Sequence, residues 1–258
     1  MLENQSNRRG GAPQRHACYD FILAMTQNLV RENFLRIQER IAEAALRAGR
    51  RAEEIRLIGV SKTHPAEAIR AAYDAGLRHF GENRVQEWEG KRGALGDLQA
   101  TWHLIGHLQS NKAGRAAKIF LSVDSVDDLG LAQRLDRARS EMGSAEKLRV
   151  LIEVRIAPEE TKSGVGISDV VDLAVSVAGL QHLEAAGVMC IPPYLEDIEQ
   201  VRPYFRKLRE LREDIQRKTG LKLPVLSMGM SHDFEVAIEE GATEVRVGAA
   251  LFGSRAVK

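Results

Sequence analysis

Residues 55–62 of the sequence are Ile-Arg-Leu-Ile-Gly-Val-Ser-Lys, a short apolar run that ends on a lysine. A run of this length and composition predicts a parallel strand that is buried on both faces. Pro65 then begins a helix, and Gly76 ends it. The unit is therefore a strand, a turn and a helix, with Lys62 at the point where the strand ends.

The same unit recurs along the rest of the chain. Seven further apolar segments are expected strands, at residues 79–83, 101–106, 120–126, 148–156, 183–191, 225–228 and 244–247. Segments with helical spacing separate them, and a helix with Phe34, Ile37 and Ile41 on one face precedes the first strand and ends at Gly49. Eight strands alternating with helices predict an α/β protein, a (β/α)8 TIM barrel with an extra N-terminal helix.

Residues 1–25 are rich in Asn, Gln, Arg and Gly and show no periodicity, which predicts a disordered N-terminal extension before a single domain at residues 26–258. The alternative is that Met25 is the natural start. Lys and Arg number 37 and Asp and Glu 36, so no bulk charge draws the chain to nucleic acid or membranes. The two distant cysteines, Cys18 and Cys190, fit a reducing cytosol and offer no metal-ligand spacing. We expect a cytoplasmic monomer without a metal.

The polar residues that could take part in chemistry follow the strands, and the active sites of such barrels lie at these strand ends. Lys62 is the clearest candidate. A lysine buried in a barrel mouth has a lowered pKa, and a neutral amine can form an imine with a carbonyl compound. The alternative is a lysine whose stem is buried while its ammonium group reaches water, and position alone leaves the two evenly matched.

A second group of candidates follows the last two strands. Ser227 and Ser231 offer hydroxyls, and Gly248 lets the backbone approach a ligand closely. Loops in these places bind phosphate in many barrels, although Gly229 and Gly248 could equally be ordinary turn glycines. A lysine and a phosphate cradle in one barrel mouth suggest a phosphorylated aldehyde as ligand.

Three further residues have two readings each. Arg246 would either bond a ring nitrogen of the ligand or pair with a carboxylate such as Glu244 or Glu82. His103 would either carry protons or be a structural residue with its hydrogen bonds satisfied. Asn83 would either bond a ligand oxygen or cap the next helix.

These residues lie within motifs that resemble those of the pyridoxal phosphate homeostasis proteins, over about residues 27–255. The matching segments are VSKT at 60–63, FGEN at 80–83 with QE at 86–87, WHLIG at 102–106 with LQSNK at 108–112, KSG at 162–164, GVM at 187–189, LSMGMS at 226–231 and RVG at 246–248 leading to FG at 252–253.

The resemblance implies a barrel like the N-terminal domain of alanine racemase, which holds pyridoxal 5′-phosphate (PLP) on Lys62 as a Schiff base. It implies phosphate contacts from Ser227, Gly248 and Ala249, and Arg246 opposite the pyridine nitrogen. Two departures from the family pattern are Ala249, where relatives often carry Thr or Ser, and His64, where many carry a second lysine. Lys162 is a further residue expected to line the mouth.

Two functions fit this reading. The first is a carrier that takes part in PLP, vitamin B6 and amino-acid homeostasis, limits the free cofactor and hands it to apo-enzymes without catalytic turnover. The second is a PLP-dependent amino-acid racemase. Alanine racemases add a β-domain that supplies a catalytic tyrosine, whereas this sequence stops soon after the eighth strand and only Tyr194 lies near the mouth. The expectation is therefore a PLP-binding protein that is not an enzyme.

Overall fold

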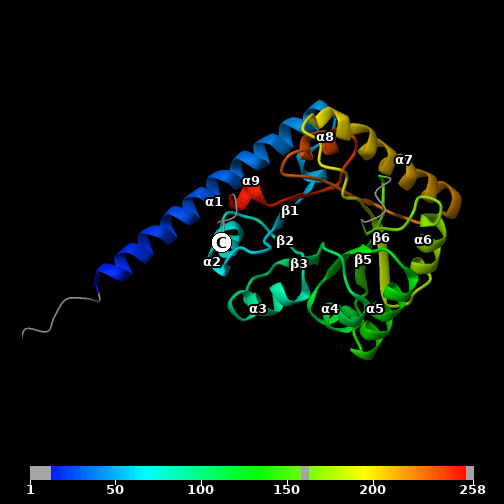
Figure 1. Ribbon diagram of the computed structural model, residues 1–258, viewed down its shortest axis with the longest axis horizontal. Coiled ribbons are helices and arrows are strands. Elements are labelled where there is room, and N and C mark those ends of the chain that lie inside the picture. The colour runs from blue at the N-terminus through cyan, green and yellow to red at the C-terminus, as the bar shows by residue number, and fades with distance from the viewer. Residues whose placement is uncertain (1–12, 158–162, 254–258) are drawn as a thin grey trace, which may run out of the picture.

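The computed structural model describes residues 13–157 and 163–253, with side chains from residue 24 onward. Eight parallel strands close into a barrel in chain order, and β8 pairs with β1 (Figure 1). This confirms the fold class expected from the sequence. The strands are β1 (Arg56–Val60), β2 (His79–Glu82), β3 (Thr101–Leu104), β4 (Ser122–Val126), β5 (Leu148–Glu153), β6 (Leu183–Met189), β7 (Val225–Met230) and β8 (Glu244–Val247).

Helices surround the barrel, and most of the apolar core fills the layer between them and the strands. Side chains alternate between the two faces of each strand, so every strand can contribute to this layer and to the barrel interior. The helices are α1 (Pro13–Arg47), α2 (Ala66–Asp74), α3 (Val85–Leu95), α4 (Ala113–Ile119), α5 (Leu129–Glu141), α6 (Val170–Ala178), α7 (Arg202–Thr219), α8 (Phe234–Glu239) and α9 (Ala249–Phe252), with short 3-10 turns at Ala52–Glu54, Ser110–Lys112 and Ile198–Val201.

The first helix differs from the expectation. It begins at Pro13, so residues 13–25 of the expected extension are helical, while residues 1–12 lie outside the described residues. The segment carries apolar residues at helical spacing, Cys18, Ile22 and Met25. The chain holds no proline or glycine between Gln14 and Arg47, and its many good helix formers favour one continuous helix. Figure 1 shows the N-terminal half of α1 projecting past the barrel, while its C-terminal half reaches α8.

Strand β7 also differs, because it extends to Met230 rather than to Met228. Its register with β8 shifts between Ser227 and Met230, around Gly229 with a φ of +91°. A Cβ at Gly229 would come within 2.9 Å of the Phe234 backbone, so this irregular strand end depends on glycine.

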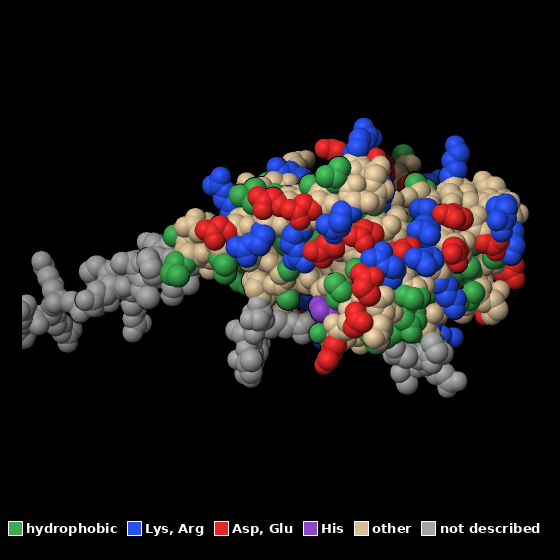
Figure 2. Space-filling view, turned by 90° about the horizontal axis from the view of Figure 1, so that it is seen from above, with side chains coloured by type: hydrophobic (Ala, Val, Ile, Leu, Met, Phe, Trp, Pro, Cys, Tyr) green, Lys and Arg blue, Asp and Glu red, His purple; other side chains and the backbone are tan. Residues whose placement is uncertain are grey.

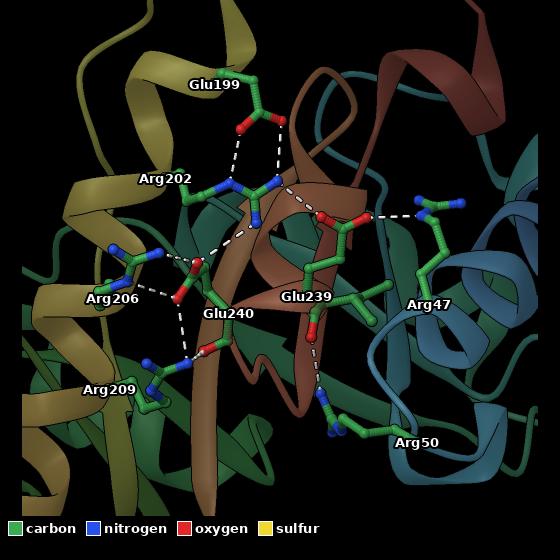
Figure 3. A network of polar contacts seen from close by, with 9 residues as sticks. Arg47, Arg50, Glu199, Arg202, Arg206, Arg209, Glu239 and Glu240 are labelled. Carbon is green, nitrogen blue, oxygen red and sulfur yellow. Dashed lines mark hydrogen bonds and ion pairs between the residues drawn. The ribbon is translucent and has the colours of Figure 1, made fainter.

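A network of ion pairs joins α7 and α8 to α1 (Figure 3). Glu240 is buried after α8 and accepts hydrogen bonds from Arg202, Arg206 and Arg209 of α7. Glu239 accepts from Arg202 and, on its other side, from Arg47 of α1. One carboxylate pair therefore connects three helices that cover the same part of the barrel.

The surface carries both signs of charge. Figure 2 shows Lys and Arg side chains interspersed with Asp and Glu over the face in view, so no single sign dominates it. Among the described residues, no helix combines the length and the apolar character that a membrane span requires.

Candidate functional site

The turn that carries Lys62 is tightly held. The Ser61 N–H continues the ladder by donating to the Gly81 carbonyl at 2.9 Å, and the His64 N–H closes a turn on the Ser61 carbonyl at 3.1 Å. Thr63, directly after the lysine, has a φ of +66°, which non-glycine residues rarely adopt. Such strain persists where the surroundings fix it, often at ligand sites. Lys62 itself is half-buried, as expected for a lysine at a barrel mouth.

A buried polar cluster supports the peptide before Lys62. The Ser61 hydroxyl donates to Glu82 Oε1 at 2.7 Å, and Lys91 of α3 donates to the same oxygen at 2.8 Å. Lys91 also donates to the Ser61 carbonyl at 2.8 Å. Burial raises the pKa of Glu82, although both partners oppose that shift. No sequence pattern singled out Lys91, which lies on a helix among other charged residues.

Arg246 is 3% exposed and joins the ends of three strands. One of its terminal nitrogens donates to the Ser227 hydroxyl of β7 at 2.6 Å, and the other donates to the Cys190 carbonyl after β6 at 2.8 Å. The guanidinium thus uses neutral partners rather than the carboxylates of Glu244 or Glu82. Burial raises the pKa of the Cys190 thiol to about 12, so that side chain stays neutral beside the arginine.

The loops after β7 and β8 meet at Ser231. Its hydroxyl accepts hydrogen bonds from the N–H groups of Gly248 at 3.2 Å and Ala250 at 3.3 Å, at the start of α9. A Cβ at Gly248 would lie 3.3 Å from the Cβ of Val60, two residues before Lys62. The first N–H groups of a helix have no partner within it, and that of Ala249 is among them. A hydroxyl and backbone N–H groups therefore converge beside the strand that leads to Lys62.

His103 lies in the barrel interior, where both of its ring nitrogens have protein partners. Nδ1 is 3.0 Å from Asp124 Oδ2, and Nε2 is 3.1 Å from Nδ1 of His79. Because His79 begins β2, this chain of contacts runs toward the amino-terminal ends of the strands, away from Lys62. The geometry favours the structural reading of His103.

Asn83 follows β2 and borders a cavity of about 530 Å³ with His107 and Lys112. Its backbone N–H donates to the Glu87 carboxylate at 3.2 Å. Arg84, not Asn83, occupies the cap position of α3, and no side-chain hydrogen bond caps the helix there. The capping reading of Asn83 is therefore wrong, and its side chain remains a candidate for a ligand.

Glu153 and Tyr194 follow or end the neighbouring strands β5 and β6. Glu153 is buried at the end of β5 and accepts a hydrogen bond from Ser163, and burial raises its pKa. Sequence patterns did not single it out, since a lone glutamate in an apolar strand has no motif. Tyr194 is 74% exposed and packs beside His232. Lys162 lies outside the described residues.

These groups fit a phosphorylated pyridine aldehyde. Lys62 supplies an amine, Arg246 a buried cation held in place, and Ser231 with the start of α9 supplies donors for a phosphate. The close approach of Gly248 to β1 keeps the phosphate cradle next to the lysine strand.

Comparison with known proteins points the same way. Residues 33–256 match the family described as alanine racemase, N-terminal domain. Pyridoxal phosphate homeostasis proteins from Aquifex aeolicus and Pseudomonas aeruginosa are 49% and 45% identical, over 87% and 88% of this chain and 97% and 96% of theirs. The structure of PipY from Synechococcus elongatus, with PLP bound, is similar at a TM-score of 0.75 and 42% identity, covering 84% of this chain and all of that one.

Proposed function

Because the chain belongs to the pyridoxal phosphate homeostasis proteins, within the alanine racemase N-terminal domain family, we propose that it binds PLP and serves intracellular PLP, vitamin B6 and amino-acid homeostasis. Lys62 holds the cofactor through a Schiff base. The observation that carries this proposal is the placement of Gly248 and the Ser231 cradle against β1, two residues before Lys62.

Each site residue then has a defined role. Ser231 binds the phosphate through its hydroxyl hydrogen and Ala249 through its backbone N–H, while Gly248, whose N–H donates to Ser231, lets the backbone approach the phosphate closely. Asn83 faces the cofactor from the end of β2. Ser227 orients Arg246, and its hydroxyl is a further candidate for a contact with the phosphate. We leave His103 out of the ligands, because both of its ring nitrogens are occupied.

Arg246 bears on the kind of chemistry that the site supports. When bound, PLP supplies a reactive aldehyde and a pyridine ring that withdraws electrons most strongly when its nitrogen is protonated. The Arg246 guanidinium is fixed by two hydrogen bonds and disfavours a second positive charge opposite it. The residues therefore support carbanion chemistry poorly, which is compatible with a carrier and also with a racemase, since related racemases use the same pairing.

We favour a carrier over a racemase. A racemase of this fold needs a second proton carrier facing Lys62, and Tyr194, the tyrosine expected nearest to the mouth, is 74% exposed. A carrier needs only binding and release. We propose that the protein acts as a cytoplasmic monomer that transfers PLP to apo-enzymes, and the free thiol of Cys190 is consistent with that compartment.

The test of binding is the visible absorption spectrum of the purified protein with added PLP. We expect an imine band that is lost in Lys62→Ala and kept in Lys222→Ala, an exposed lysine that serves as the matched control. Borohydride reduction followed by peptide mapping should label the Lys62 peptide. The same band in the parent and in Lys62→Ala would remove Lys62 from the proposal.

The test of function uses the loaded protein. Incubation with an apo-enzyme that requires PLP should restore that enzyme's activity, and Lys62→Ala loaded in the same way should transfer little. Racemisation of amino acids by the parent that disappears in Lys62→Ala would favour the racemase instead.

A further inference from the structure

A second cavity opens at the amino-terminal end of the barrel, opposite to the end that carries Lys62. Its volume is about 740 Å³, within the range of small-molecule sites. Polar and charged side chains near the beginnings of several strands line it, among them Arg56 of β1, His79 of β2, Arg149 of β5 and Glu244 of β8. The lining also includes Arg50, Glu53, Glu54, Arg78 and Glu184. The interior of such barrels is usually filled by branched apolar side chains, and a polar cavity at this end is therefore unusual.

Glu244 lines the cavity, and one of its two carboxylate oxygens has no donor among the described residues. It is 1% exposed, and its Oε1 accepts hydrogen bonds from Arg56 and Arg149, both at 2.7 Å. Its other oxygen, Oε2, is buried and has no hydrogen-bond partner among the described residues. A buried carboxylate oxygen without a donor is costly, and an ammonium group would satisfy it.

His79 offers a second acceptor. Burial, and next to it the neighbouring His103, lower the pKa of His79 to about 3, so its imidazole is neutral. Nδ1 of His103 contacts the Asp124 carboxylate, and Nε2 of His103 lies 3.1 Å from Nδ1 of His79. When Nδ1 donates in that contact, Nε2 of a neutral ring is left as an acceptor, on a residue that lines the cavity.

Arg56 adds the opposite charge at the rim. Its side chain is 44% exposed, and its bond to Glu244 uses one terminal nitrogen of a group with five N–H donors. An arginine in this position suits a carboxylate. The cavity therefore presents both acceptors and guanidinium groups to a ligand.

We propose that this cavity binds a free α-amino acid, with the ammonium group at the Glu244 carboxylate and His79 and the carboxylate at Arg56. The zwitterion matches both charges of the site, which an amine or an acid alone does not. This site is separate from Lys62, and the proposal does not depend on the proposed function.

The experiment uses cofactor-free Lys62→Ala protein, so that no bound aldehyde at the other end of the barrel can react with the amino group of the probe. Saturation-transfer NMR would compare L-alanine with propionate and alaninamide, which each keep one of its two charged groups. We expect L-alanine to bind with a Kd of about 1 mM or tighter, and each analogue about tenfold more weakly.

Variants place the site. Arg56→Gln and Glu244→Gln should each raise the Kd for L-alanine about tenfold, whereas Arg51→Gln, a neighbour that is 79% exposed and outside the cavity, should not. If Glu244→Gln fails to fold, the Kd of Arg56→Gln for L-alanine still tests the proposal, because the Arg56 side chain is 44% exposed and its replacement should leave the fold intact. Absence of binding, equal binding of either analogue, or an affinity that Arg56→Gln leaves unchanged would each overturn the proposal.

Discussion

Replacing Ser227 by alanine tests whether the serine holds Arg246. In the parent, the Ser227 hydroxyl accepts a 2.6 Å hydrogen bond from a guanidinium that is 3% exposed, and both groups are cut off from water. Ser227→Ala leaves one charged N–H group buried without an acceptor. Removing one partner of such a bond costs about 2 kcal/mol, within the range for bonds to charged groups. For a chain of this size the melting temperature should fall by about 4–8 °C.

Urea denaturation of the cofactor-free protein measures this loss, followed by far-UV circular dichroism. The matched control is Ser125→Ala, since the Ser125 hydroxyl is also buried but donates to the neutral carbonyl of Gly106 at 2.7 Å. That variant should lose about 1 kcal/mol. Equal losses in the two serine variants, or none in Ser227→Ala, would refute the reasoning that the charge of Arg246 sets the cost.

The PLP affinity of the same variant separates two roles for Ser227. A serine that only orients Arg246 should change the absorption spectrum of the bound cofactor, because the ring environment shifts, and should leave most of the affinity. A serine that also binds phosphate should in addition weaken PLP binding by about tenfold, as for the loss of one charge-assisted hydrogen bond.

Three other substitutions have defined outcomes. Glu153→Gln should stabilise the protein at neutral pH and have little effect near pH 4. Burial raises the pKa of Glu153, so its ionisation destabilises the folded protein only as the pH rises through the folded-state pKa. Urea denaturation midpoints at the two pH values check this. Gly229→Ala should cost about 2 kcal/mol or more and weaken PLP binding, since its φ is +91° and a Cβ would lie 2.6 Å from a neighbouring methyl. Gly220→Ala, at a φ of +73° with open space around it, should cost about 1 kcal/mol in the same melts, and a loss as large as that of Gly229→Ala would count against the steric argument. Glu240→Gln should lower stability by about 2 kcal/mol in thermal melts, because a buried carboxylate faces three arginines, and a loss no larger than that of the exposed Glu199→Gln would contradict this.

The sequence predicted the barrel because its signals are local. Each strand is a short apolar run between turn residues, and strand ends in a parallel barrel must share one edge, so Lys62, Ser231, Arg246 and Gly248 could be brought together without coordinates. The small errors also have local causes. The helix before β1 was predicted too short because the polar, glycine-containing start of the chain was taken together with residues 13–25, which are helical.

Contacts that depend on register or on side-chain reach could not be predicted. His103 contacts His79 only because β2 and β3 pair in a particular register. The sequence of either strand alone does not determine that register. Lys91 reaches Glu82 from the side of α3, where charged residues usually face water. The cavity at the amino-terminal end could not be predicted for the same reason, because residues at the beginnings of several strands form it together.

The position of α1 has a consequence for how the protein is made. The Asn33 amide of α1 donates to the carbonyl of Leu251 in α9, across 218 residues, at 3.0 Å. The contact of α1 with α9 and the pairing of β1 with β8 can therefore form only after most of the described residues have been synthesised. At about 5–20 residues per second, the ribosome needs about 10–40 s to bridge that separation. During this interval α1 and β1 can already contact α2 and β2. The part of α1 that packs on α8 and α9 still lacks its partners, and so does the edge of β1 that pairs with β8, and an unpaired strand edge of this kind favours aggregation.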